Sequence, residues 1–322
     1  MACDFQSLPH PGIQTLSPYI PGKSIDELAR EQGLTNIIKL ASNENPLGCS
    51  LTVKEMMAKL LTQYIASYPD HMNHPLRQKL AGKLGVDKEM ITLANGSDAL
   101  FPLILMCFAL HRDKEVLVHD YSFIPYRIYA QSLGIPFVSV AVNADWEVEI
   151  ERFISACHEK TAIIFIANPN NPTGTYIPLA QIKKLLDNIS QSTILVVDEA
   201  YHEYSNIKEK TSAESLLEGY PNLIVTRTFS KAYGLAGLRI GYAISHPDIT
   251  SILVRAMEPF AINQAGLAGA YAALDDEAFL ADTLKTNERG IEQLKYGLQE
   301  LGIDYIEPHG NFITLNLKQD TR

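Results

Sequence analysis

The stretch TFSKAYGLAGLRIGYA, residues 228 to 243, places Lys231 among small and apolar residues. A lysine removed from water tends to lose its proton, and a neutral amine is a nucleophile that forms a Schiff base with a carbonyl group. Arg239 follows eight positions later, and a nearby guanidinium would lower the pKa of the lysine further. Most lysines lie on exposed loops, so other parts of the chain must distinguish a nucleophile from a surface residue.

Polar residues that could act together with Lys231 follow two other apolar runs. Asn171 lies in NPNNPTG, directly after AIIFIA, while Asp198 and Tyr201 follow ILVV. Taken singly, the first motif is typical of a turn, and the aspartate is typical of a helix cap or a salt bridge. An ionised carboxylate at the end of an apolar run nevertheless needs a cationic partner. Three consecutive strands that end in Asn, in Asp with Tyr, and in Ser-Lys therefore indicate one shared ligand site.

Pyridoxal phosphate would use all of these groups. It needs an amine for its aldehyde, a carboxylate for its ring nitrogen, donors for its phenolic oxygen and a phosphate pocket. Lys231 would provide the amine, and Asp198 would keep the ring nitrogen protonated. Asn171 and Tyr201 would hold the phenolic oxygen. Tyr121, just past the apolar run EVLVHD, could stack its ring on the cofactor or lie in the core.

The phosphate pocket is expected where ANGSDAL, residues 94 to 100, joins a strand to a helix. Free backbone N–H groups at the start of a helix bind anions, which makes Gly96, Ser97 and Asp98 candidate cofactor-binding residues. Ser230 and Arg239 would add a hydroxyl and a fork of charged donors from the lysine segment itself.

The elements that position these residues are predicted from about residue 90 to 245. Short apolar runs rich in Val and Ile alternate there with longer amphipathic stretches, which is typical of a parallel sheet covered by helices. Ligands of such sheets bind beyond the carboxyl ends of the strands, where the candidate residues lie. The expected strands are 90–94, 115–120, 136–142, 162–168, 193–199, 223–229 and 241–245, and the expected helices are 97–110, 122–133, 178–189 and 212–218.

The pattern divides the chain into two parts. After residue 262 it becomes helical to about Gly302, and one more strand is expected at 311–317. We therefore predict a large cofactor-binding domain over 45–262, with a three-layer α/β/α fold around a mostly parallel sheet. Residues 1–44, which are rich in turn residues, and 263–322 are expected to form an N-terminal arm and a smaller α+β domain.

Composition excludes several classes of protein. A net charge of −10 and a pI near 5.4 argue against nucleic-acid binding. The longest apolar run, residues 99 to 110, is too short to cross a membrane. Four scattered cysteines and the lack of a basic and apolar leader favour reduced thiols in a cytoplasm. The histidines of HMNH at 71 to 74 have no further ligands nearby, so no metal site is expected.

Eight motifs occur in one order along the chain: YIPGK, KLASNENPLG, YPD, NGSD, NPNNPTG, VVDEAY, TFSKAYGLAGLRIGY and GNFI. As a set they resemble the fold-type-I pyridoxal-phosphate aminotransferases, and within them most closely the histidinol-phosphate aminotransferases. The resemblance implies that Lys231 is the Schiff-base lysine and proton shuttle. It implies the roles given above for the other strand-end and phosphate-pocket residues.

Three further roles follow from the resemblance alone. Tyr68, in SYPD, looks like the tyrosine that reaches the cofactor phosphate of a neighbouring subunit, which implies a homodimer with shared active sites. Tyr19, in SPYIPG, looks like part of a pocket for the substrate phosphate. Asn43, in SNENP, is similar to a residue near the substrate carboxylate.

The reaction implied by the resemblance is reversible transfer of an amino group between glutamate with 2-oxoglutarate and histidinol phosphate with imidazole acetol phosphate, in histidine biosynthesis. An aromatic aminotransferase or an amino-acid phosphate decarboxylase on the same scaffold is the alternative. A cofactor-binding protein of low activity is another. The family normally continues past NFITLNL with arginines for the substrate, which no position here matches. We therefore expect the small domain to be incomplete, and we expect the chain to hold the cofactor but to transaminate poorly.

Overall fold

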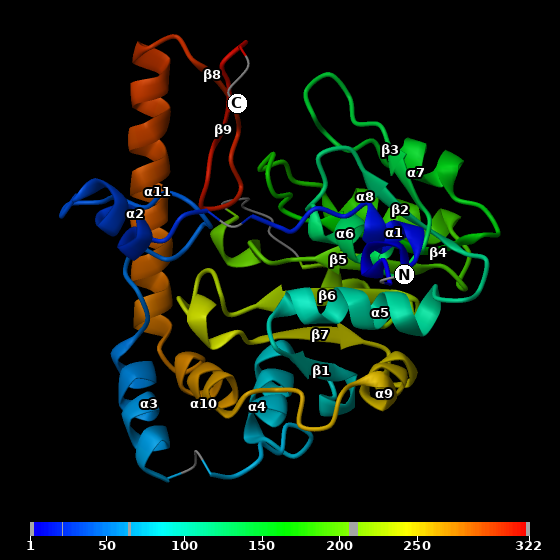
Figure 1. The fold of residues 1–322 in the computed structure, drawn as a ribbon, viewed down its shortest axis with the longest axis horizontal. Helices are drawn as coiled ribbons and strands as arrows, with labels where there is room; N and C mark the ends of the chain where they lie inside the picture. Colours follow the sequence, from blue (N-terminus) through cyan, green and yellow to red (C-terminus); the bar gives the residue numbers. More distant parts are fainter. Residues whose placement is uncertain (1–2, 21, 64–65, 206–211, 320–322) are drawn as a thin grey trace.

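The computed structural model describes residues 3–20, 22–63, 66–205 and 212–319. Its centre is a seven-stranded sheet in the order β1-β7-β6-β5-β4-β2-β3, which crosses the middle of Figure 1. The sequence predicts all seven strands to within two residues at each end. They are β1 (Ile91–Ala94), β2 (Glu115–His119), β3 (Phe137–Val140), β4 (Thr161–Ala167), β5 (Ile194–Asp198), β6 (Leu223–Thr228) and β7 (Gly241–Ser245).

The sheet is mostly parallel, as predicted. Strand β7 runs antiparallel to both of its neighbours, β1 and β6, while the pairs β2–β3, β2–β4, β4–β5 and β5–β6 are parallel. The carboxyl ends of β4, β5 and β6 therefore lie side by side at one edge of the sheet.

The apolar residues of the central strands alternate between two cores on opposite faces of the sheet. Ile164 and Ile166 of β4 belong to one core, whereas Ile163 and Phe165 belong to the other. The first core is covered by α3 (Leu51–Gln63), α4 (Pro75–Leu84), α7 (Ile150–Ala156), α8 (Leu179–Asn188) and α10 (Gln264–Ala273), and the second by α5 (Leu100–Phe108), α6 (Pro125–Ser132) and α9 (Pro247–Ala256). Because helices cover both faces, the interior residues of β4 and β5 are apolar, and the predicted three-layer α/β/α fold is confirmed.

Three of the four predicted helices are present. They are α5, preceded by a short 3₁₀ turn over Ser97–Ala99, α6 and α8. The prediction of a helix at 212–218 is wrong, because only a 3₁₀ turn forms there, over Ala213–Leu216. Its first N–H group, on Ala213, donates 2.8 Å to the carboxylate of Glu199, so this segment is held by a side chain rather than by a regular helix.

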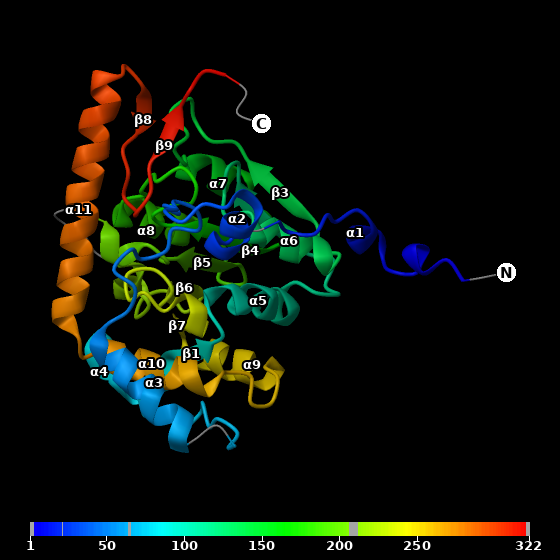
Figure 2. The ribbon, with the colours of Figure 1, turned by 60° about the vertical axis from the view of Figure 1, so that its left-hand side comes forward.

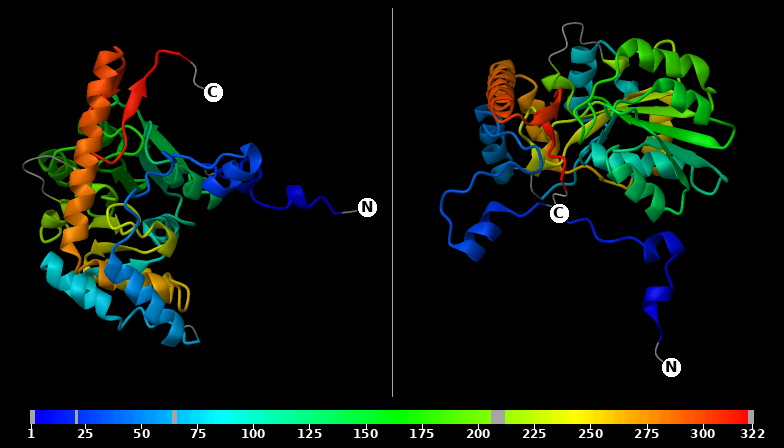
Figure 3. Two further views of the ribbon diagram at one scale, coloured as in Figure 1. Left: turned by 90° about the vertical axis from the view of Figure 1, so that its left-hand side faces the viewer. Right: turned by 90° about the horizontal axis from the view of Figure 1, so that it is seen from above.

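The N-terminal residues lie outside the sheet, as predicted, but contain two short helices that were not predicted. These are α1 (Pro11–Gln14) and α2 (Ile25–Gln32). The stretch before α1 reaches away from the rest of the molecule (Figures 2 and 3). The chain contacts the rest of the molecule at the start of α1. There His10 Nε2 lies 2.8 Å from the carbonyl oxygen of Ser132 at the end of α6.

The C-terminal part is a long helix beside a two-stranded sheet. Helix α11 (Glu277–Glu300) runs along one side of the molecule (Figure 1), and β8 (Asp304–Ile306) pairs antiparallel with β9 (Thr314–Asn316). Strand β9 is shorter than predicted, and β8 was not predicted. Helix α10, which the predicted division assigns to this part, packs against α3 and α4; the division itself stays a prediction.

The described ranges contain no helix that is both long and apolar enough to cross a bilayer. All four cysteines are free thiols.

Candidate active site

A cavity of about 380 Å³ opens at the carboxyl ends of β4, β5 and β6, the last residues of which line it. The structure brings ten of the thirteen predicted site residues to its wall: Tyr19, Asn43, Ser97, Asp98, Asn171, Asp198, Tyr201, Ser230, Lys231 and Arg239. Gly96 lies next to this wall in the chain. The sequence did not single out Ser42, Phe123, Ala167, Pro169, Ala200 or Thr228, which complete the lining.

The amine of Lys231 lies in this cavity without an ionic partner. Its Nζ donates a 2.8 Å hydrogen bond to the backbone carbonyl of Ser42 and lies 5.6 Å from the centroid of the Tyr201 ring. None of the carboxylates in the described ranges forms an ion pair with it. Burial lowers the pKa of Lys231, more than the opposing charges of Asp98 and Glu44 raise it. Desolvation is thus the main cause of the lowered pKa, and Arg239 contributes a smaller effect in the same direction. A lowered pKa favours the neutral, nucleophilic form of the amine.

Asp198 ends β5 in a fully enclosed position. Tyr126 Oη donates to its Oδ2 at 2.8 Å, and Thr226 Oγ1 donates to its Oδ1 at 3.0 Å. Burial raises the pKa of Asp198 to about 6, although both hydrogen bonds act to lower it. Both donors, Tyr126 and Thr226, are neutral. Among the described residues, no side chain serves as the cationic partner that the sequence predicts for Asp198. A cation brought into the cavity would stabilise the ionised carboxylate.

The hydroxyl of Tyr201 is oriented by two amides. Asn43 Nδ2 donates to Tyr201 Oη at 3.0 Å, and Asn171 Nδ2 donates to it at 3.1 Å. Burial raises the pKa of this tyrosine to about 12, so the hydroxyl keeps its proton. A hydroxyl has two acceptor positions and one donor hydrogen. With both acceptor positions used, the O–H group is left to donate to a molecule in the cavity.

The other end of the cavity suits an anion. Gly96 has φ +80°, a backbone conformation that favours glycine. A Cβ atom there would lie 2.7 Å from Arg239 Nη2, so this turn lies close to the guanidinium. Arg239 Nη1 lies 3.4 Å from Ser230 Oγ, and Nη2 lies 3.5 Å from Asp98 Oδ2. The backbone of Ser97 and Asp98 begins a helical segment, where free N–H groups face an anion.

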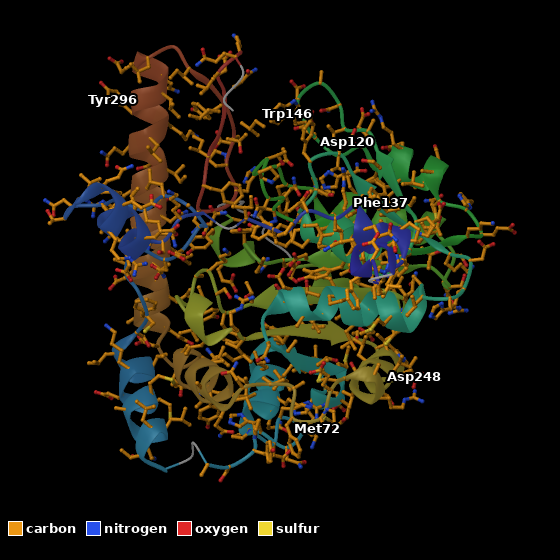
Figure 4. All side chains as sticks on the ribbon, in the orientation of Figure 1. Met72, Asp120, Phe137, Trp146, Asp248 and Tyr296 are labelled. Carbon is orange, nitrogen blue, oxygen red and sulfur yellow. The ribbon has the colours of Figure 1, made fainter. Side chains whose placement is uncertain are left out.

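Tyr121 does not line the cavity. Its ring is about half exposed and stacks on Trp146, with centroids 4.9 Å apart; Trp146 is labelled in Figure 4, on the loop between β3 and α7. The alternative that it is a core residue is wrong, whereas its predicted contact with a cofactor stays a prediction. The aromatic side chain on the wall is Phe123, two residues later. The motif DYSF contains both rings, and nothing in its pattern shows which of them faces the cavity.

Tyr68 also lies away from the cavity of its own chain. It is 78% exposed and stacks on Phe260, with centroids 4.4 Å apart. Tyr19, by contrast, lines the cavity although it is 69% exposed.

Comparison with known proteins shows what the chain resembles. The family model described as aminotransferase class I and II matches residues 35–321. A protein named histidinol-phosphate aminotransferase 2 from Legionella pneumophila (strain Lens) is 53% identical over 321 residues, which are 100% of this chain and 87% of that protein. The crystal structure of histidinol-phosphate aminotransferase from Sinorhizobium meliloti in complex with pyridoxal-5'-phosphate is 26% identical, with a TM-score of 0.87 over 98% of this chain and 83% of that one.

The fold is also similar to that of an enzyme with a different reaction. The crystal structure of L-threonine-O-3-phosphate decarboxylase from Porphyromonas gingivalis matches with a TM-score of 0.71 and 25% identity, over 84% of this chain and 79% of that one.

Proposed function

Since the chain belongs to the class I and II aminotransferase family, we propose that it is a pyridoxal-phosphate-dependent histidinol-phosphate aminotransferase. The reaction would exchange an amino group between histidinol phosphate with imidazole acetol phosphate and glutamate with 2-oxoglutarate, in histidine biosynthesis. The relative at 53% identity over the whole chain carries that name, which supports the choice of substrate.

The observation that carries the proposal is the convergence of three strand ends on one cavity. There Lys231 offers an amine without an ionic partner, Asp198 a buried carboxylate held by neutral donors only, and Tyr201 a free O–H donor. Gly96, Ser97 and Arg239 frame an anion site at the other end. This donor set fits an aldehyde, a ring cation, a phenolic oxygen and a phosphate on one small molecule.

When bound, pyridoxal phosphate supplies a ring that withdraws electrons from the substrate carbon bearing the amine. The side chains of this chain would do the remaining work. Lys231, the pKa of which is lowered mainly by desolvation, can move a proton at that carbon. Asp198 would stay ionised beside a cation, and the hydroxyl of Tyr201 would donate to an oxygen anion.

We assign the ring-packing role to Phe123 rather than to Tyr121. Phe123 is on the wall of the cavity and packs edge-on against the buried ring of Tyr126, with centroids 5.5 Å apart. Tyr126 in turn donates to Asp198. The aromatic wall and the carboxylate are therefore held by the same cluster.

Substrate binding is proposed for Asn43 and Tyr19. Asn43 contacts the Tyr201 hydroxyl, so it lies near the group that acts on the substrate. Tyr19 lines the cavity entrance, where a substrate phosphate would enter. The exposed ring of Tyr68 is consistent with service to the cavity of a second copy in a homodimer.

The substrate is tested by a direct comparison. Purified protein loaded with pyridoxal phosphate is incubated with 2-oxoglutarate and either histidinol phosphate or phenylalanine, and glutamate formation is measured; release of carbon dioxide from O-phosphothreonine is followed in parallel. We expect the highest kcat/KM with histidinol phosphate. Faster turnover of phenylalanine, or carbon dioxide release without glutamate, would identify one of the alternative enzymes instead. Lys231→Ala is the negative control, and it should be inactive in all of these assays.

A further inference from the structure

The guanidinium of Arg239 is weakly held by its own contacts. Its hydrogen-bond distances to Ser230 Oγ, to the carbonyl of Ala236 and to Asp98 are 3.4, 3.4 and 3.5 Å, at the long end of the usual range. The backbone of Arg239 has φ +48°, a left-handed conformation that non-glycine residues adopt rarely. The position of Arg239 must therefore be fixed by contacts to its backbone rather than by those of its side chain.

The side chain of Asn263 contacts the backbone on both sides of the Arg239 Cα atom. Its Nδ2 group lies 2.9 Å from the carbonyl oxygen of Leu238 and 3.3 Å from that of Arg239. Both carbonyls flank the left-handed residue. An amide donor shared by two successive carbonyls stabilises that one arrangement of the peptide.

The same side chain reaches the opposite half of the anion site. Asn263 Nδ2 and its backbone N–H donate to Asn95 Oδ1 at 2.8 and 3.0 Å, and Asn95 Nδ2 donates to the carbonyl of Ala261 at 2.5 Å. Asn95 directly precedes the Gly96 turn. Asn263 therefore joins the two segments that frame the anion site, although neither it nor Asn95 lines the cavity.

The first residues of helix α10 leave room for the contacts of Asn263. Asn263 caps the helix, because its Oδ1 accepts a 2.6 Å hydrogen bond from the N–H of Gly266. A Cβ atom at Gly266 would lie 2.8 Å from the carbonyl oxygen of Leu238 and 3.0 Å from Asn263 Nδ2. The glycine thus leaves the space in which the asparagine and the carbonyl meet.

We propose that Asn263 is a positioning residue that holds the Gly96 turn and Arg239 at the separation required by the phosphate of the cofactor. This inference rests on the proposed function, since it takes the anion to be the phosphate of pyridoxal phosphate. It assigns to the start of α10 a role in phosphate recognition, although no residue of this helix lines the cavity.

The test compares two ligands that differ only in the phosphate. Affinities of the cofactor-free protein for pyridoxal phosphate and for pyridoxal are measured by equilibrium dialysis. Asn263→Ser is the main variant, because serine keeps the helix cap and removes the amide donors. Asn222→Ser is the matched control, since Asn222 Nδ2 also donates to two carbonyls, at 2.9 and 3.4 Å, beside the opposite end of β5.

We expect Asn263→Ser to bind pyridoxal phosphate about tenfold to a hundredfold more weakly, the loss of one charge-assisted contact, while its affinity for pyridoxal changes less than about twofold. Asn222→Ser should leave both affinities unchanged. An equal loss for both ligands, or no loss for either, would overturn the positioning role. If Asn263→Ser does not fold, Gly266→Ala tests the same contact with the same two outcomes. A failure of the unmodified chain to bind either ligand would instead reject the cofactor.

Discussion

Asp198 shows how a single residue is prepared for a partner that the chain does not supply. It is fully enclosed, and Tyr126 and Thr226 satisfy its two oxygens without adding charge. Tyr126 cannot move away, because its ring is stacked on Phe165 with centroids 4.8 Å apart and meets Phe101 edge-on at 4.9 Å. The carboxylate is thus held in place and remains short of positive charge.

The raised pKa of Asp198 makes a prediction about stability without cofactor. The pKa is about 6 in the folded protein, against an ordinary value of 3.8, so the folded form binds more protons than the unfolded form between these values. The stabilisation is complete below about pH 4 and is lost as the pH rises through 6. We expect the free energy of unfolding to fall by roughly 2 kcal/mol more in the unmodified protein than in Asp198→Asn between pH 4 and pH 7. Denaturant titrations at both pH values measure this, and parallel pH dependence of the two proteins would contradict it.

Residue-level prediction succeeds where chemistry and strand ends coincide. Asp198 ends a strand, and Lys231 and Asn171 each lie a few residues after one, so the rule for parallel sheets brings them to one cavity. Tyr126 and Asn263 are not predicted, because their partners lie 72 and 168 residues away in the chain. A local sequence pattern cannot predict contacts between residues that lie so far apart in the chain. Their residue types are also ordinary for a helix and for a helix cap.

At the scale of elements, a buried ion pair joins the two strands that carry the chemistry. Arg227 of β6 donates through Nε and Nη2 to Glu199 Oε2, both at 3.0 Å, and Nη2 also lies 3.0 Å from Glu214 Oε2. Glu199 directly follows Asp198, and Arg227 precedes Lys231 by four residues. The pair therefore fixes the relative position of the β5 and β6 ends.

Removing only one partner of this pair should be costly. Arg227→Met leaves a carboxylate buried without its cation, which costs about 3–5 kcal/mol of stability. The double variant Arg227→Met with Glu199→Gln should regain part of that loss, because the buried charge is removed as well. Denaturant unfolding of the single and double variants gives both values. Lys183→Met, at an exposed pair with Asp187, should change stability little. A double variant no more stable than Arg227→Met would show that the charge is not the cause.

The elements themselves were predicted with different success. Strands β4 and β5 are continuous apolar runs that only a sheet covered on both faces can bury, so they were predicted closely. The turn at Ala213–Leu216 was mistaken for a helix, because its hydrogen bond to Glu199 comes from tertiary structure. Strand β8 has three residues and a single partner strand, too short for a period of two to be visible.

At the scale of the whole molecule, two of the predicted site residues, Tyr68 and Tyr19, lie on the molecular surface. Tyr68 is exposed beside Phe260 and outside its own cavity, as a side chain that serves a second copy would be. Tyr19 lines the cavity from an exposed segment. These positions are the basis of the proposal that the site is shared between two copies of the chain.

Subunit complementation tests the shared site. Mixing subunits that carry Tyr68→Phe with subunits that carry Lys231→Ala forms hybrid dimers in which one site has an intact lysine and receives an intact tyrosine. We expect activity of the mixture above that of either variant alone. Exchange of subunits is verified by native mass spectrometry. Verified exchange with no recovery of activity would place Tyr68 outside the partner's site.

The most direct test of the proposed function is the site at which the cofactor becomes attached. The protein is incubated with pyridoxal phosphate, reduced with borohydride and digested, and the peptides are analysed by mass spectrometry. We predict one pyridoxyl group per chain, on Lys231, because this amine is buried, has a lowered pKa and has no carboxylate partner. Lys231→Ala should carry none. Attachment at another lysine, or equal labelling of Lys231→Ala, would contradict the assignment of this cavity as the active site.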